Sequence, residues 1–184
     1  MTLIEFLERH RSTLLERWFE ALLATYPAEA VAQFAKNREV FTNPVGSTAR
    51  RCLEATVEEF LGEADGPRLE QALEELVRVR AVQEFKPSEA LDFAFSLRKV
   101  IEDLVHRSGG TLRANLSELE PKYERLLRAA LDRYVASRDL LHDIRGRELR
   151  DRHFKMLERV EEAYGELRGR RGRQQEEPSR EECP

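Results

Sequence analysis

The chain has 184 residues, a formal net charge of −4 and a charged fraction of 36%. Apolar residues make up 41% of the sequence, which is enough for a hydrophobic core and excludes a globally disordered protein. The charge balance provides no overall basic field for nucleic acid, so we expect no nucleic-acid partner. Two cysteines, Cys52 and Cys183, cannot form a disulfide framework or a zinc site, so we expect a protein of the reducing cytoplasm.

The start of the chain predicts an amphipathic helix. Thr2 and Glu5 have the spacing of a capping box, in which each side chain satisfies a backbone N–H of the other residue. The apolar stripe of this helix consists of Leu3, Phe6, Leu7, Leu14, Leu15, Trp18, Leu22 and Leu23. Charged residues interrupt the stripe, which argues against a signal peptide, and no later segment is apolar for long enough to span a membrane.

Pro27 should end this helix, because the residue before a proline avoids the helical region, and can open a second helix. The short apolar face of the second helix would contain Val31, Phe34 and Ala35.

The motif FTNPVGST, residues 41–48, predicts the start of a third helix. Asn43 is a good N-cap, and Pro44 suits the first helical position. Gly46 would allow another element to approach closely, and Phe41 could pack back as a hydrophobic staple. The helix should end near Leu61, and its buried face should contain Ala49, Leu53, Val57, Phe60 and Leu61.

Pro67 and Pro87 should open a fourth and a fifth helix. The apolar positions of these two helices are Leu69, Leu73, Leu76, Val77 and Val79, and then Leu91, Phe93, Phe95, Leu97, Val100, Ile101 and Leu104. Phe93 and Phe95 are two residues apart and cannot both lie at the centre of one stripe, so we expect one of them to face a cavity or a partner.

The last helix should begin at a capping box of Ser117 and Glu120 and run for some 50 residues, with Gly146 as a candidate kink. Its first half has an apolar stripe of Leu127, Leu131, Tyr134, Leu141 and Ile144. Leu157, Val160, Tyr164 and Leu167 then follow a heptad spacing. Such a helix would span about 75 Å, more than a small domain can cover.

We therefore divide the chain into a helical domain at 1–115, a long helix at 116–168 and a disordered polar tail at 169–184. We expect a homodimer built on the last two helices, with the distal part as a coiled coil or as a docking site for a signalling partner. The candidate face for a dimer or partner consists of Tyr134, Leu141, Ile144, Leu157, Val160, Tyr164 and Leu167.

Catalytic motifs are absent from the sequence, so we expect no enzyme and no cofactor. The four histidines, His10, His106, His142 and His153, lack metal-ligand spacing. His106 is the best candidate for a haem ligand, although a histidine at a helix end more often caps carbonyls. The basic stretch RGRRGR, residues 168–173, could contact RNA or an anionic surface, but the acidic residues after it favour a solubilising tail.

Three blocks within residues 10–105 together resemble a known family: LLERWFEALLATYP, FTNPVGST and VRVRAVQEFKPSEALDFAFSLRKVI. They are similar to the RsbRD N-terminal domain, the variable amino-terminal domain of RsbT co-antagonist proteins in bacterial stressosomes. The resemblance implies an all-α, globin-like, haem-free domain that dimerises. It also implies a regulatory input that acts through protein contacts or a small ligand.

The resemblance draws attention to Asn43, Pro44 and Gly46 in the first motif and to Arg78 and Arg80 in RVRAVQ. For these residues we favour structural roles, namely a helix start for the first three and surface salt bridges for the two arginines. Co-antagonists continue into a phosphorylated STAS domain, whereas this chain continues into a long helix and a polar tail. We therefore expect no phospho-switch here.

The alternatives are a free-standing input module, a module of another signalling system such as one with histidine kinases, or a sensor that binds a ligand or cofactor, haem included.

Overall fold

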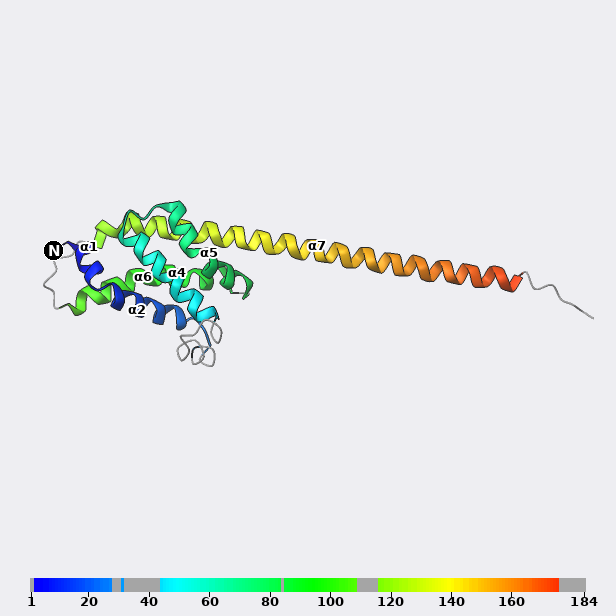
Figure 1. The fold of residues 1–184 in the computed structure, drawn as a ribbon, viewed down its shortest axis with the longest axis horizontal. Coiled ribbons are helices and arrows are strands. Elements are labelled where there is room, and N and C mark those ends of the chain that lie inside the picture. Colours follow the sequence, from blue (N-terminus) through cyan, green and yellow to red (C-terminus); the bar gives the residue numbers. More distant parts are fainter. Residues whose placement is uncertain (1, 28–30, 32–43, 84, 109–115, 176–184) are drawn as a thin grey trace, which may run out of the picture. The chain divides into compact units, whose positions relative to one another are not determined.

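A computed structural model of the protein describes residues 2–27, 31, 44–83, 85–108 and 116–175. The described part is all-α, without strands, and confirms the predicted fold class and the long C-terminal helix (Figure 1). Its helices are α1 (Leu3–Arg9), α2 (Arg11–Leu23), α4 (Pro44–Leu61), α5 (Gly66–Val82), α6 (Pro87–Arg107), a 3-10 turn (Leu116–Leu119) and α7 (Glu120–Gln175). None of these described helices is long and apolar enough to cross a membrane.

The chain forms two compact units, residues 1–139 and residues 140–184, and the boundary falls inside α7. In the first unit, α2 packs against α4 and α6, α4 packs against α5, and α1 contacts α2 and α4. Its largest fully buried apolar side chains are Leu7, Leu14, Trp18, Leu22, Leu53, Phe60, Leu69, Leu73, Leu76, Phe93 and Leu97. The indole Nε1–H of Trp18 donates to the Phe93 carbonyl at 2.6 Å, so this large ring is buried with its polar atom satisfied.

The predicted first helix is divided into α1 and α2 at His10, so the prediction of one continuous helix is wrong. The Thr2–Glu5 capping box is present, with the Glu5 N–H donating to the Thr2 hydroxyl at 3.1 Å. At the break, the His10 ring Nδ1 donates to the Phe6 carbonyl at 2.8 Å. A side chain that bonds to a backbone group nearby competes with the helical ladder, which accounts for the break.

Helix α4 begins at Pro44 and ends at Leu61, as the sequence predicts. The five residues predicted to face inward from α4 are all buried. The predicted N-cap Asn43 and the staple residue Phe41 lie outside the described residues. Phe34 and Ala35 of the predicted second helix lie outside them too, whereas the N–H of Val31 donates to the Pro27 carbonyl at 3.1 Å.

The end of α4 is fixed from within its own turn and from α7. Ala64 has a φ of 54°, in the left-handed region, and its N–H donates to the Glu59 carbonyl at 2.8 Å. The ammonium group of Lys122 on α7 donates to the carbonyls of Phe60, at 3.1 Å, and Gly62. A cation at the C-terminus of a helix also favours the dipole of that helix.

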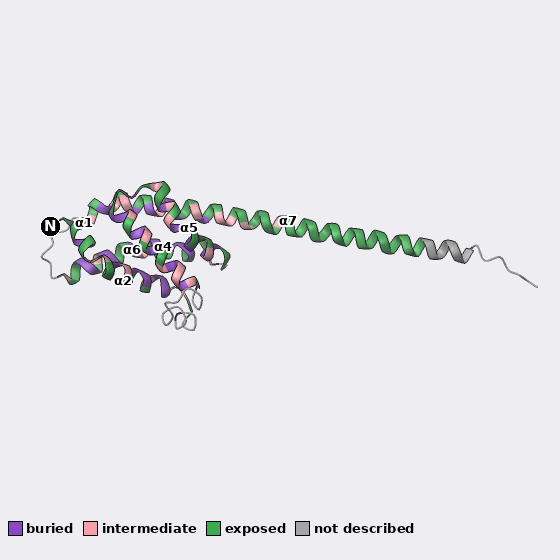
Figure 2. Cartoon of the chain, viewed as in Figure 1, coloured by how far each residue is buried: buried purple, intermediate pink, exposed green. Residues whose placement is uncertain are grey.

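Helix α7 is continuous through Gly146, so the structure shows no break at the candidate kink. Its first part, up to Asp139, belongs to the first unit and buries Tyr123, Leu126, Ala129, Ala130 and Tyr134. In the second unit, every residue from 147 to 168 is exposed (Figure 2).

Candidate functional site

Arg80 lies inside the helical unit and is fully buried, so the prediction that it forms a surface salt bridge is wrong. Its Nε–H donates to the Ala90 carbonyl at 2.7 Å, and its Nη2 donates to the Glu89 carbonyl at 2.6 Å. Both carbonyls belong to the first turns of α6. The guanidinium therefore ties the end of α5 to the beginning of α6.

Two aromatic rings complete the surroundings of Arg80. The guanidinium carbon lies 4.4 Å from the ring centroid of Phe85 and 5.1 Å from that of Tyr26. The two rings meet edge to face, with centroids 5.5 Å apart. Cation–π contacts and charge-assisted hydrogen bonds both compensate the charge of a buried cation. Among the described residues, Nη1 of Arg80 has no hydrogen-bond partner.

The position of Arg80 in the sequence indicates burial, although arginine is usually an exposed residue type. Position 80 follows Leu76 by four residues and Val77 by three, so it lies on the apolar stripe of α5. Arg78 is off that stripe and is exposed.

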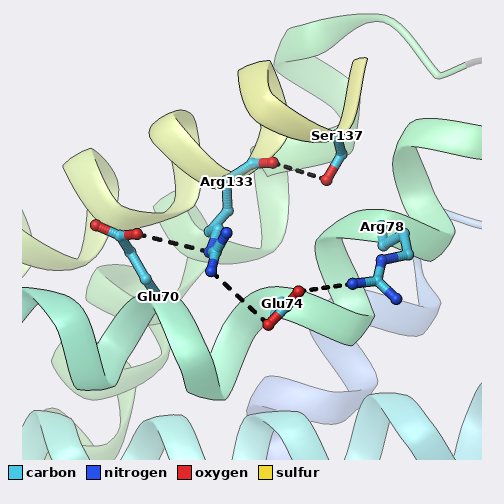
Figure 3. Close-up of polar contacts among 5 residues, drawn as sticks. All are labelled: Glu70, Glu74, Arg78, Arg133 and Ser137. Atoms are coloured by element: carbon cyan, nitrogen blue, oxygen red, sulfur yellow. Dashed lines mark hydrogen bonds and ion pairs between the residues drawn. The ribbon is translucent and has the colours of Figure 1, made fainter. Parts of the chain in front are cut away.

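Arg78 confirms the surface interpretation, since its Nη2 pairs with Glu74 at 2.6 Å, one turn earlier on α5. Glu74 also faces Arg133 of α7, whose Nη2 is 3.7 Å away, and the Nε of Arg133 lies 3.6 Å from Glu70 (Figure 3). The hydroxyl of Ser137 donates to the Arg133 carbonyl at 2.8 Å. These contacts join the first part of α7 to α5, although half-exposed ion pairs stabilise by only about 0.2–1 kcal/mol each.

The tyrosine of the candidate partner face, Tyr134, is buried in the first unit, which corrects its assignment to that face. Its hydroxyl donates to the Phe85 carbonyl at 3.4 Å, next to the Arg80 cluster. Arg138, one turn later, donates to the Ala81 carbonyl at 3.4 Å. The junction of α5 and α6 is thus held by Arg80 from inside and by α7 from the other side.

Gly46 is buried in the first turn of α4, in agreement with the close approach expected there. Pro44 is the first residue of that helix, and Asn43 lies outside the described residues. As the pattern predicts, only one of the two α6 phenylalanines is in the core: Phe93 is fully buried and Phe95 is 56% exposed. Phe95 lies with Leu127 at the edge of a cleft of about 400 Å³.

A cleft with a volume of about 730 Å³ lies beside the Arg80 cluster and is open to solvent. It is lined by Ala21, Ala24, Thr25, Tyr26, Pro27, Phe85, Ser88, Glu89 and Asp92. Tyr26 and Phe85 also contact Arg80, but the acidic groups on the rim give this cleft little affinity for anions.

The histidines give the haem alternative no buried axial ligand. All four lie in described parts of the chain; His10 is half-buried, and His106, His142 and His153 are exposed. Among the described residues, no group of three His, Cys, Asp or Glu side chains is arranged to hold a metal ion. Cys52 is buried, and burial raises the pKa of its thiol, which makes it a poor nucleophile.

The exposed face of the second unit contains most of the residues that the heptad pattern singled out. Four exposed residues have the heptad spacing: Leu157, Val160, Tyr164 and Leu167. Ile144 is also exposed, one turn beyond the half-buried Leu141. Four further large apolar residues are exposed: Leu140, Leu149, Phe154 and Met156. Nothing in the described part of the chain covers this face, which we call the distal face (residues 147–168). An exposed apolar set of this extent is typical of an interaction surface.

Comparison with known proteins identifies one family. The family model of the RsbT co-antagonist protein RsbRD N-terminal domain matches residues 12–149. The match covers more than half of the chain and extends beyond the blocks at 10–105 into α7. No curated protein and no solved structure gives a significant match.

Proposed function

Because the chain belongs to the family of RsbT co-antagonist protein RsbRD N-terminal domains, we propose that it is a regulatory input module that acts by binding other proteins. The family match at residues 12–149 is the observation that carries this proposal. The match includes α2, α4, α5, α6 and the part of α7 that completes the first unit. We place the module in the bacterial cytoplasm and assign it a signalling role rather than catalysis.

The contacts of the first unit support a route for a signal. Phe85 touches Arg80 through its ring and Tyr134 through its carbonyl, so the α5–α6 junction and α7 share one residue. Lys122 and Arg133 add contacts from α7 to α4 and α5. In this proposal, a partner or small ligand that alters the junction changes the position of α7, and α7 continues into the second unit. Allosteric coupling requires such an element with two arrangements.

The experiment is recovery of the tagged full chain from its own bacterial cells under native conditions, followed by sedimentation and identification of bound proteins. We expect a specific assembly that contains a signalling protein, for example one with a STAS or kinase domain. The double variant Arg133→Ala with Tyr134→Phe, which loosens the α7 contacts, should change the recovery of that partner. A chain that sediments alone under all growth conditions would contradict the proposal.

Absorption spectroscopy of the same purified material tests the remaining alternative. A stoichiometric Soret band would replace the protein-contact function with that of a haem sensor. We expect no such band, because none of the four histidines is buried.

A further inference from the structure

The cleft of about 400 Å³ that Phe95 borders lies between α6 and α7, inside the first unit. Its volume is in the range of clefts that hold small molecules in other proteins. Both helices contribute to it, and its described lining consists of Ala94, Phe95, Arg98, Glu120, Tyr123, Glu124 and Leu127. The lining therefore combines an apolar part with a few polar groups, which is the usual composition of a ligand site.

Tyr123 contributes a buried hydroxyl to this cleft. The residue is 6% exposed, and its hydroxyl oxygen has no hydrogen-bond partner among the described residues. Its ring packs against Phe60 of α4, whereas its hydroxyl is close enough to Arg98 and Glu120 of the cleft lining to experience their charges. A buried hydroxyl without a partner destabilises the folded chain, so its presence at a cleft calls for a partner from outside the chain.

The charged side chains of the cleft are already paired with one another or with their neighbours. The guanidinium of Arg98 contacts Glu102 through Nε at 3.1 Å and Glu120 through Nη2 at 2.7 Å. Glu124 pairs with Arg128 at 2.6 Å. A charged ligand would have to compete with one of these pairs, whereas an uncharged ligand leaves them in place. Because such surface pairs are weak, the half-exposed Arg98 can move aside while a ligand enters and then re-form its pairs.

The apolar part of the cleft is incompletely covered within the chain. Phe95 is 56% exposed, and Leu127 of α7 is half-buried. The core contact of this part of α6 is supplied by Phe93, so packing inside the domain does not account for a second aromatic ring at position 95. A ligand with an apolar body that covers Phe95 and Leu127 would remove their exposed area from water.

We propose that this cleft binds a small uncharged molecule that has an apolar, ring-sized body and one hydrogen-bond acceptor. The body covers Phe95 and Leu127, and the acceptor receives the hydrogen bond of the Tyr123 hydroxyl. Burial raises the pKa of Tyr123, so the hydroxyl keeps its proton at neutral pH and donates. The proposal rests on the proposed function in one respect, since it assigns a ligand class to the input. A ligand that contacts both helices favours the arrangement of α7 against α6 to which it binds best.

The test uses benzophenone, which has two apolar rings and one carbonyl acceptor and attaches covalently to adjacent C–H groups under near-ultraviolet light. Equilibrium dialysis with the purified full chain measures its affinity. Diphenylmethane has the same rings without the acceptor and should bind about fivefold more weakly, the factor that one net hydrogen bond supplies. 4-Benzoylbenzoate adds a carboxylate and should also bind more weakly than benzophenone. Peptide mapping after irradiation should place the label within residues 94–98 and 120–127.

Variants of the full chain separate the hydrogen bond from the apolar contact. Tyr123→Phe should weaken benzophenone about fivefold and leave diphenylmethane unchanged, whereas a merely structural role of Tyr123 would weaken both probes alike. Phe95→Ala should weaken both probes about tenfold, because both lose the same apolar contact. Tyr134→Phe is the matched control, since it removes a hydroxyl from the same helix outside the described lining, and it should change neither affinity.

Three results would each overturn the proposed site: no saturable binding of benzophenone, a label that maps outside α6 and the first part of α7, or a Tyr123→Phe chain that binds benzophenone as tightly as the wild type. The proposed function is judged separately, by the partner recovered from cells. A chain that binds the probe as expected but sediments alone would keep the site and contradict the proposed function. A chain that is recovered with a signalling protein but does not bind the probe would do the reverse.

Discussion

Helix α5 and the part of α7 beyond Asp139 are both charged helices with several large apolar residues, yet they have opposite surroundings. Helix α5 buries Leu69, Leu73, Leu76, Val77, Arg80 and Ala81, whereas residues 147–168 bury nothing within one chain. In α5 the apolar residues recur every three or four positions and meet α4 and α6. The difference shows that apolar content alone does not stabilise a helix, because each residue contributes only through what covers it.

The largest effect is expected when the same leucine-to-alanine substitution is made in α5 and in the part of α7 beyond Asp139. Leu73→Ala removes a fully buried side chain of α5 and should lower the free energy of unfolding by about 2–5 kcal/mol. Leu157→Ala, at a side chain that is 58% exposed, should change the unfolding of the first unit by less than about 0.5 kcal/mol. Trp18 is the only tryptophan and is buried in the first unit, so its fluorescence in urea reports this transition. Equal losses in the two variants would break the comparison.

The second prediction compares a buried and an exposed arginine, both on α5. Arg80→Met should cost about 2–3 kcal/mol, because the carbonyls of Glu89 and Ala90 lose their donor in a buried place. Arg78→Met removes only an exposed ion pair with Glu74 and should cost less than about 0.5 kcal/mol. Urea midpoints of the two variants measure the difference. If Arg80→Met were as stable as the wild type, the guanidinium would not hold α5 to α6.

The third prediction concerns helix starts. Thr2→Ala should cost about 1 kcal/mol, since it removes the acceptor for the Glu5 N–H. Asn43→Ala should cost a similar amount if Asn43 caps α4 as its sequence position predicts. Thr13→Ala is the control, because Thr13 is exposed inside α2 and should be neutral within about 0.5 kcal/mol. Thermal midpoints that are unchanged in both cap variants would remove the capping interpretation.

Much of the fold could be predicted from the sequence because its signals are local. The capping box at Thr2, the prolines that open α4, α5 and α6, and the inward face of α4 are set by neighbours within one or two turns. The break at His10 was missed, because the residue is compatible with a helix and only its bond to the Phe6 carbonyl shows the competition.

The candidate site was harder to predict for two physical reasons. The sequence places Arg80 on the apolar stripe of α5, but arginine is a residue type that usually lies on the surface. The carbonyls that compensate its charge come from α6, and the two rings come from residues 26 and 85. The distal face was predicted in part, with Tyr134 wrongly included, because periodicity shows a stripe without showing what covers it.

The smallest effect at neutral pH is expected at Tyr123, the point where α7 packs against α4. Its ring lies 5.2 Å from that of Phe60, and its buried hydroxyl has no hydrogen-bond partner among the described residues. Tyr123→Phe keeps the ring and removes an unpaired polar atom, so stability should stay within about 0.5 kcal/mol or rise slightly. Tyr134→Phe is the matched control, because it loses a bond to the Phe85 carbonyl and should cost up to about 1 kcal/mol.

The same variant should change the response of the protein to alkaline pH. Burial raises the pKa of Tyr123 well above its ordinary value. In the unfolded chain a tyrosine loses its proton near pH 10, while the folded chain retains it. The stabilising contribution is therefore complete below about pH 10 and is lost as the pH rises toward the folded pKa. Urea midpoints followed upward from neutral pH should decline above about pH 10 in the wild type and in Tyr134→Phe, and decline less steeply in Tyr123→Phe. Equal slopes in all three proteins would show that the hydroxyl of Tyr123 reaches water, and that α7 lies less tightly on α4 than α5 does.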